Sequence, residues 1–565
     1  MPSLTRKMIN GHAYYYLREC RRVNGKPKIV SQQYLGRVED IVAALARPAA
    51  AAPQPHTARV RSFGGVVALY DLARRLGLVE LIDRHVPKRG GGPTVGQYLV
   101  LAAINRCLAP RSKARCVDWY EQTVLPRLLP FRPAQLSSQR FWDHMDRVEA
   151  AAITAIDQEL AARLVQQFHV DPRCLFYDAT NFFTFIDTFN TRSRLAQRGH
   201  SKEGRDSLRL VGLALLVSAD FHVPLLHHTY AGNQPDAPTF RSLADELLAR
   251  YKTFATGVEK ITLVFDKGNN AHDTVNGLKD YHFVGSLVPG QHPDLLAVSP
   301  RQLKPLEDAR LEKVSTWRTH KAVYGHERTI VVTFNEALFA AQEKTLRREV
   351  AKRSKRLAKL QRALRGWQQK AKAGRAPTQA GTEKAVAQIL SGRHMKELFE
   401  IDVTLGRRGL PILRYHFNRS HWNHLNRTLL GKTLLFTDRD DWSDAEIVRA
   451  YRGQAHVEAA FRTMKDPHWV SFRPMFHWTD QKVRVHAFYC VLALTLAGLL
   501  RRALAAKGIH ISTAAMFEQL EQIRQVTVIY PAQRRAVRTQ MVLGEISPLQ
   551  QQLYDALDLG RHFPA

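Results

Sequence analysis

The chain has 565 residues, a length that exceeds one compact core and predicts about three or four domains. Its 83 lysine and arginine residues outnumber 51 acidic residues, and the formal charge of +32 indicates a polyanionic partner, with nucleic acid ahead of an anionic membrane surface. The five cysteines are scattered without a CxxC pair, so they suggest neither a zinc site nor a disulfide framework.

We expect neither a signal peptide nor a membrane-spanning segment in this sequence. Residues 1–16 lack the apolar core of a signal peptide, and the longest apolar run, 488–500, is shorter than the roughly 18 residues that span a bilayer. We therefore expect a cytoplasmic protein without a membrane partner, in which residues 488–500 form a core helix.

A basic β-hairpin module is predicted over residues 1–45. Residues 12–23 and 26–36 read as strands around Asn24-Gly25, a strong signal for a hairpin turn. The surplus of basic residues fits a nucleic-acid contact and a solvated surface equally well. Residues 46–58 are rich in alanine and proline and are predicted to be a linker.

Residues 59–170 are predicted to be a helical DNA-binding region. Apolar spacing indicates helices over residues 64–78, with Gly77 as a cap, over 95–108, and from Ser137 or Ser138 to about residue 167. The basic segment 111–115 follows the second helix. Helix, turn and helix with a basic exit is typical of a DNA-reading module, and a purely structural bundle is the alternative.

The pattern becomes β-rich over residues 171–290. Three strand-like runs are followed by a helix at 239–254, a fourth run, and a further helix and strand; the runs are CLFYDATNFFTF, LRLVGLALLVSAD, HVPLLHHTYAG, KITLVFDKGNN and YHFVGSLV. Three antiparallel strands, a helix and a fourth strand parallel to the first form the order of an RNase H-like core. We expect an α+β fold with a mixed five-stranded sheet and flanking helices.

Residues 291–440 are predicted to be an insertion into this core. Residues 344–375 carry thirteen Lys/Arg and one acid, with apolar residues recurring about every 3.5 positions. Because charge of one sign repels itself unless phosphates relieve it, we expect this helix to bind DNA through residues such as Lys352 and Arg356. A solvated helix packed on one side is the alternative.

Two acids stand in apolar strands of the core. Asp178 lies within CLFYDATN, and Asp266 ends ITLVFD. An unpaired buried carboxylate costs several kcal/mol, and two of them on strands about 4.8 Å apart also repel each other. A shared divalent metal ion removes both difficulties, so the pair predicts a metal site.

A third acid lies in the last part of the core, residues 441–510, ahead of a helical region at 511–565. Ser443 and Glu446 form a capping box that starts a helix. One face of this helix is expected to carry Tyr451, Gln454, Glu458, Arg462 and Lys465. Most acids are merely solvated, but three in the order strand, strand and helix predict a metal site with phosphate donors around it.

These motifs give the chain a family resemblance. It resembles bacterial insertion-sequence transposases of the DDE type, in the branch with a Tyr-Arg-Glu-Lys signature and a large insertion before the catalytic Glu. The residues that carry the resemblance are YDAT, FDKGNN, RGHSKEGR, AGNQPD, RPMFHW and Tyr451-x2-Gln454-x3-Glu458-x6-Lys465. The family has Arg at the position of Gln454, which puts the phosphate contacts in doubt; Arg462 is the better substitute, since Arg452 lies about 200° away around a helix.

The resemblance implies a function and a set of partners. Asp178, Asp266 and Glu458 would hold two Mg²⁺ ions, for which Mn²⁺ can substitute, and would cleave element ends and join them to target DNA. Lys465, Arg462 and Tyr451 would contact DNA. A homodimer in a paired-end complex is implied, in the bacterial nucleoid and without a nucleotide cofactor.

Two points remain open at this stage. Trp422 is a candidate to hold a flipped base, with a core position as the alternative. The rival functions are an RNase H-like nuclease without strand transfer and a DNA-binding protein whose acids are structural. A membrane protein fits least, because the basic helix lacks a broad apolar face.

Overall fold

The structure is a computed structural model that describes residues 2–564, apart from 24–25, 47–54, 89, 188, 206, 220, 235–244, 248, 253–260, 267–280, 370–374, 407 and 531–537. The predicted Asn24-Gly25 turn, most of the linker, part of the helix at 239–254 and the residues that follow Asp266 lie outside the described residues. The chain forms two compact units: Met1–Arg61 with Arg524–Glu545, and Ser62–Ile523 with Ile546–Phe563.

The first unit contains two small antiparallel sheets. The predicted strands β2 and β3 pair as expected, and β1 adds a third strand on the other side of β2. The sequence prediction missed β1 although it carries the same signal, because Asn10-Gly11 adopts φ of 50° and 80° and makes the turn into β2. The elements are β1 (Pro2–Ile9), β2 (His12–Val23), β3 (Lys26–Gly36), α1 (Val38–Ala46), β4 (Thr57–Ser62), β17 (Arg524–Ile529) and β18 (Thr539–Leu543).

The C-terminal region differs from the expectation of a helical region at 511–565. The first helix of this region is α18 (Thr513–Gln522) and the last is α19 (Pro548–Ala556). Strands β17 and β18 come between these helices in the sequence and pair with each other. The run RQVTVI explains this difference, since four of its six residues are β-branched and suit a strand better than a helix.

The helical part of the second unit follows the predicted order. Gly77 has φ of 60°, and its N–H donates to Arg74 O at 2.9 Å, so it ends one helix and starts the next as its residue type predicts. The expected helix from Ser137 to residue 167 is divided in two. The helices are α2 (Gly64–Arg75), α3 (Leu78–His85), α4 (Val95–Leu108), α5 (Cys116–Glu121), α6 (Leu125–Leu128), α7 (Ser138–Met145) and α8 (Ala150–Gln166).

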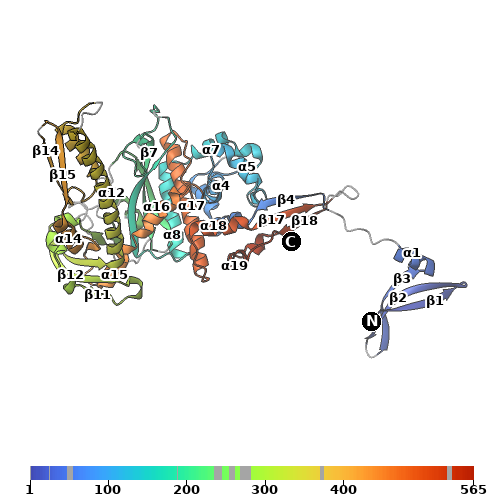
Figure 1. The fold of residues 1–565 in the computed structure, drawn as a ribbon. Coiled ribbons are helices and arrows are strands. Elements are labelled where there is room, and N and C mark those ends of the chain that lie inside the picture. The colour runs from blue at the N-terminus through green and yellow to red at the C-terminus, as the bar shows by residue number, and fades with distance from the viewer. Residues whose placement is uncertain are drawn as a thin grey trace. The chain divides into compact units, whose positions relative to one another are not determined.

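A mixed sheet forms the centre of the second unit (Figure 1). Its middle runs β8-β7-β5-β9-β10, in which β5, β7 and β8 pair antiparallel, whereas β5, β9 and β10 pair parallel. The strands are β5 (Cys174–Phe183), β6 (Gln197–Arg198), β7 (Arg209–Ser218), β8 (Pro224–Ala231), β9 (Thr262–Val264) and β10 (His282–Ser286).

The sheet has ten strands rather than the expected five. Beyond β10 it continues through β16, β13, β12 and β11, all of which come from the region predicted as an insertion. A strand left at the edge would expose a row of unpaired N–H and C=O groups, and β16 satisfies this row on β10. The added strands are β11 (Lys304–Pro305), β12 (Val314–Val323), β13 (His326–Asn335) and β16 (Lys432–Thr437).

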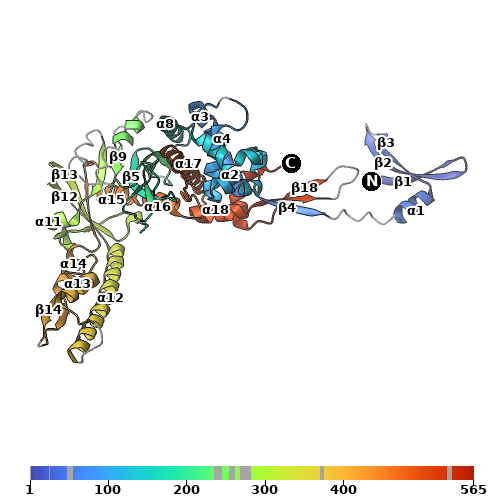
Figure 2. The same ribbon diagram turned by 90° about the horizontal axis from the view of Figure 1, so that it is seen from above.

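The rest of the insertion has its own small core (Figure 2). The predicted basic helix is α12, which begins at Glu336 rather than Lys344, and its buried residues are Leu346, Leu357 and Leu364. They pack with residues of the neighbouring elements in one apolar cluster, called the insertion core below. These elements are α12 (Glu336–Gln369), α13 (Gln379–Ile389), β14 (Phe399–Leu405), β15 (Pro411–Phe417) and α14 (Arg419–Thr428).

Three further helices complete the second unit: α15 (Asp444–Arg452), α16 (Ala455–Lys465) and α17 (Asp480–Ala505). The capping box before α15 is confirmed, because Ser443 Oγ accepts from Glu446 N and Glu446 Oε2 accepts from Ser443 N. Within the described residues, α17 is the one helix that is long and apolar enough to cross a membrane. Of its most apolar stretch, 94% is buried inside the protein. This burial agrees with the core helix predicted at 488–500.

Candidate active site

The sheet register places the two strand acids side by side. Phe176 of β5 and Val284 of β10 both pair with Val264 of β9. Two residues further along each strand, on the same face, stand Asp178, Asp266 and Ser286. The three polar side chains therefore occupy corresponding positions on three adjacent parallel strands.

Two hydroxyl groups hold Asp266. The Tyr451 hydroxyl donates to Asp266 Oδ1 at 3.0 Å and the Ser286 hydroxyl to the same oxygen at 3.1 Å. Burial, and then the negative charge of Asp266, raise the pKa of Tyr451 well above its ordinary value, so the phenol keeps its proton and remains a donor. Ser286 was not among the predicted site residues, and no motif around it in the sequence signals this position.

Helix α16 runs along the face of β5 that carries Asp178. The ring of Phe176 packs edge-on against His456, with centroids 5.7 Å apart, and Phe182 lies 6.4 Å from Phe461 in the same way. Asp178 lies between the two phenylalanines on the strand, and Glu458 lies between their two partners on the helix. Packing thus brings the Glu458 segment of α16 toward the Asp178 segment of β5.

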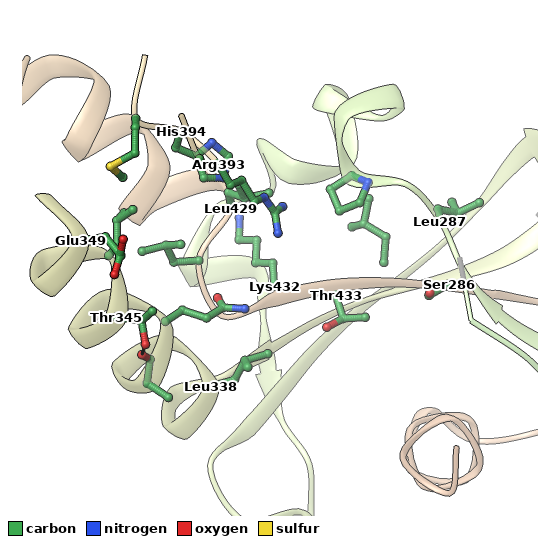
Figure 3. Close-up of a pocket in the computed structure, with 18 of the residues that line it drawn as sticks. Ser286, Leu287, Leu338, Thr345, Glu349, Arg393, His394, Leu429, Lys432 and Thr433 are labelled. Atoms are coloured by element: carbon green, nitrogen blue, oxygen red, sulfur yellow. Dashed lines mark hydrogen bonds between the residues drawn. The ribbon is translucent and has the colours of Figure 1, made fainter. Parts of the chain in front are cut away.

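Glu458 and Asp266 share one cavity. It has a volume of about 300 Å³, and Tyr451 and Gln454 also line it. A larger cavity of about 550 Å³ adjoins the same place, since Tyr451 and Ser286 form part of its wall (Figure 3). Tyr451 therefore lines both cavities, the one that contains Asp266 and Glu458 and the larger one next to it.

The helix that carries the third acid is interrupted, which corrects the expectation of one continuous face. Gln454 N donates to Tyr451 O at 3.0 Å and His456 N to Gly453 O at 2.8 Å, bonds with the tighter spacing of three residues. A Cβ on Gly453 would lie 2.3 Å from the Phe176 ring, so the interruption allows the chain to approach the sheet. The Tyr451 hydroxyl contacts Asp266. The Arg462 side chain is exposed and does not lie on the same face as Tyr451.

Lys465 lies at the other end of α16, against β5. Its Nζ donates to Thr180 Oγ1 at 2.9 Å, two residues beyond Asp178 on the same face. Burial lowers the pKa of Lys465, against the opposing effects of Glu203 and Asp178. The lysine is thus a half-buried cation within the field of the first strand acid.

Three more charged residues surround this position. Lys202 Nζ donates to Ala179 O at 2.9 Å, next to Asp178. Glu203 lies 3.9 Å from Lys465 Nζ and 3.8 Å from Arg473 Nη1. They come from RGHSKEGR and RPMFHW, motifs that sequence analysis noted without assigning roles to these side chains.

The donor set suits a hard divalent cation. Carboxylate oxygens are the ligands that Mg²⁺ prefers, and Asp178, Asp266 and Glu458 supply them from two strands and a helix. Among the residues that the structure describes, the oxygens of these three acids do not all lie within 4.8 Å of one another. Asp178 Oδ1 accepts from Ala179 N at 2.8 Å, and Asp266 Oδ1 accepts from the two hydroxyls.

The predicted DNA contacts of the insertion lie away from these acids in the sequence. Lys352 and Arg356 are exposed on α12. Trp422 packs against the insertion core, 5.9 Å from Phe417 by ring centroids, and the Arg347 guanidinium lies 5.3 Å over its ring. This surrounding favours the packing interpretation of Trp422 over a role in holding a base.

Comparisons with known proteins give a distant likeness among the solved structures. No protein-family model matches the chain, and no curated protein matches it. Among solved structures, the chain is similar to piggyBac transposase in a synaptic complex with hairpin DNA, with a TM-score of 0.34 and 9% identity over 81% of this chain and 78% of that one. A likeness at this level assigns neither a function nor site residues to the chain.

Proposed function

We propose that the chain is a DNA transposase of the DDE type, in which Asp178, Asp266 and Glu458 form the catalytic centre. The observation that carries the proposal is the parallel register of β5 and β9, which sets Asp178 beside Asp266, together with α16, which brings Glu458 to the same cavity as Asp266. Packing alone gives no reason to set two acids side by side on an apolar sheet.

The strand order supports an RNase H-like core. In the order β8-β7-β5-β9-β10, the first three strands along the chain are antiparallel, and the next two are parallel to the first. Ligands of open α/β sheets bind at the carboxyl ends of the strands. Asp266 follows the end of β9 and Ser286 is the last residue of β10, beside Asp178 within β5. The proposed site therefore lies where this topology favours one.

The three acids would hold two Mg²⁺ ions, or Mn²⁺ in their place, which supply Lewis-acid stabilisation and an activated water or 3′-hydroxyl. Tyr451 and Ser286 fix the orientation of Asp266 through their hydrogen bonds to Oδ1. These hydroxyls act as positioning groups, because they reach the carboxylate rather than the substrate.

Cations beside the acids would bind the scissile strand. Lys465 and Lys202 approach β5 next to Asp178, and Arg473 is joined to Lys465 through Glu203. Phosphate oxygens would find charged donors there that are already held by hydrogen bonds. Arg462 is exposed on the same helix and would contact DNA further out, whereas the buried Gln454 lines the cavity.

The basic face of α12 would track a DNA backbone. Its exposed cations form a row of nine, namely Lys344, Arg347, Arg348, Lys352, Lys355, Arg356, Lys359, Arg362 and Arg365. The apolar residues of the helix face the insertion core, so the charges are displayed on the opposite side. A transposase brings two element ends together, and we propose a homodimer that cleaves both ends and joins them to target DNA.

The first test is metal-dependent cleavage. The substrate is a labelled duplex made from DNA that flanks the coding sequence, incubated with Mg²⁺ or Mn²⁺. We expect nicking by the parent and at least about a thousandfold slower nicking by Asp178→Asn, Asp266→Asn and Glu458→Gln, with duplex binding kept. The exposed Glu518→Gln is the matched control and should nick like the parent.

The outcomes separate the rival functions. Nicking without joining to a second duplex would favour a nuclease of the same fold. Binding without nicking in any metal would favour a DNA-binding protein with structural acids. Nicking that survives Asp266→Asn would overturn the assignment of the site.

A further inference from the structure

A second group of metal-ligating side chains lies in the insertion, apart from the three proposed catalytic acids. His394 and Glu397 come from the turn that precedes β14, and His421 lies in the first turn of α14. One ligand atom from each of the three residues lies within 4.8 Å of the other two, and this is the one such group found among the residues that the structure describes.

The imidazole of His421 has an atom without a partner. Its Nε2 is buried and makes no hydrogen bond. The helix holds the residue in place, because His421 N donates to the capping oxygen of Asn418 at 2.8 Å. His421 therefore combines a buried nitrogen that has no partner with a ligand atom close to an imidazole and a carboxylate, and a coordinate bond would satisfy such a nitrogen.

The backbone of His394 is also unusual. It has φ of 65°, in the left-handed region that favours glycine, and Leu398 N donates to its carbonyl at 3.2 Å. This turn therefore holds His394 in a defined backbone conformation beside Glu397 and His421.

The ligand set selects the kind of metal. Two imidazoles and one carboxylate suit Zn²⁺ and related transition metals, whereas Mg²⁺ prefers oxygen ligands. The positive charge of Arg393 repels any cation. It therefore disfavours ions that are bound mainly by electrostatic attraction, such as Mg²⁺, and favours ions that form strong coordinate bonds to nitrogen. His424 lies one turn along α14, with its ring centroid 6.0 Å from that of His421, and this imidazole or a water can complete a fourth position.

We propose that His394, Glu397 and His421 bind one Zn²⁺ ion that links the turn before β14 to α14. The absence of paired cysteines does not bear on this site, because none of its ligands is a thiolate. Met395 and Leu398, on the same turn, and Leu425 of α14 are buried in the insertion core. The ion would therefore fasten two segments that already share an apolar core.

The site adjoins the large cavity described above. Figure 3 shows His394 and Arg393 at one end of this cavity and Ser286 at the other, with Lys432 and Thr433 between them. A metal ion that fixes the turn would also fix this end of the cavity wall. The zinc site would thus set the shape of a cavity whose far end is Ser286, which bonds to Asp266.

The test is Zn²⁺ binding to the full chain after treatment with a chelator. We expect one tightly bound ion by calorimetry, and visible absorption bands typical of imidazole ligands when Co²⁺ replaces zinc. Loss of a group that only orients a metal ligand costs about 10- to 100-fold in affinity, so losing a ligand in His421→Gln or Glu397→Gln should weaken binding by more than about a hundredfold.

Two controls keep this test separate from the proposed function. His416→Gln alters an exposed imidazole on β15 and should bind zinc like the parent, and Asp266→Asn should do so as well. Zinc binding that is unchanged in both ligand variants, or absent from the parent, would overturn the proposal. If His421→Gln fails to fold, zinc binding by Glu397→Gln decides the question, because Glu397 is exposed. If zinc binding changes in Asp266→Asn but in neither ligand variant, the ion belongs to the proposed catalytic acids, and the proposal is wrong.

Discussion

Lys465 of α16 and the cations of α12 are placed in opposite ways. Lys465, at the end of α16, is half-buried, bonded to Thr180 and set within the field of Asp178, whereas Lys352 and Arg356 on α12 are exposed. One charge is positioned by the packing of a helix on a sheet. The others are positioned only by helical periodicity over the insertion core.

This difference predicts different kinds of effect. A half-buried cation acts at one position, on one phosphate, in an environment that strengthens its interactions. An exposed row of cations acts through its total charge, and salt screens it within about 8 to 10 Å. Substitution near the acids should therefore change rates, and substitution on α12 should change affinity and its dependence on salt.

Among the cations, the largest effect is expected at Lys465. Lys465→Met keeps the length of the side chain but removes its charge beside Asp178, and we expect cleavage to slow about a hundredfold with duplex binding nearly unchanged. Single-turnover cleavage with saturating protein measures this change. A loss of binding without a loss of rate would place Lys465 with the cations of α12 instead.

The pH dependence sharpens the same point. Burial lowers the pKa of Lys465 in the folded protein below its ordinary value of 10.5. Between the folded pKa and 10.5, the folded state therefore binds fewer protons than the unfolded state. Stability should rise with pH across that window, while cleavage that needs the charged lysine should fall. Lys465→Arg stays charged and should keep its cleavage rate there; a parallel fall in both proteins would contradict this role.

Gly453 tests the approach of the helix to the sheet. A Cβ at this position would lie 2.3 Å from the Phe176 ring, and overpacking of this kind costs about 1 to 3 kcal/mol. Gly453→Ala should therefore lower the free energy of unfolding by about 2 kcal/mol, as measured by urea denaturation. Gly290→Ala is the control, because a Cβ there meets no atom within 4 Å.

Tyr451 tests whether the phenol positions Asp266 or contacts DNA. Tyr451→Phe removes one of two hydrogen bonds to Asp266 Oδ1, and we expect about tenfold slower cleavage, in line with a bond to a charged group. The KM for the duplex should not change. A raised KM with an unchanged kcat would show instead that the hydroxyl contacts the DNA backbone.

The sequence predicted residue types at the candidate site better than it predicted their partners. Asp178 and Asp266 stood out because a charge in an apolar strand needs a reason, and the capping box at Ser443 fixed the start of α15. Ser286 did not stand out, since a serine at the end of a strand is common and only the register of β10 brings it to Asp266. The interruption at Gly453 was missed because a close approach to Phe176 is a long-range contact.

The fold shows the same division. Strands β2, β3, β5, β7 and β8 followed from local turns and apolar runs, but the extension of the sheet through β16 did not, because pairing across more than 140 residues leaves no local signal. The zinc ligands His394 and His421 were missed for the same reason. Their spacing in the sequence matches no compact motif, and only the insertion core brings them together.

The smallest effect per residue is expected on α12. Removing two exposed charges with Lys352→Ala and Arg356→Ala should reduce the slope of log affinity against log salt by about 1.8, since each released counterion contributes about 0.9. Fluorescence anisotropy at several salt concentrations measures this slope. Lys384→Ala with Lys507→Ala removes the same charge from exposed positions outside α12, and this pair should leave the slope unchanged. If the slope falls equally in both double variants, DNA binding depends only on the total charge of the protein. In that case α12 does not bind the DNA backbone specifically.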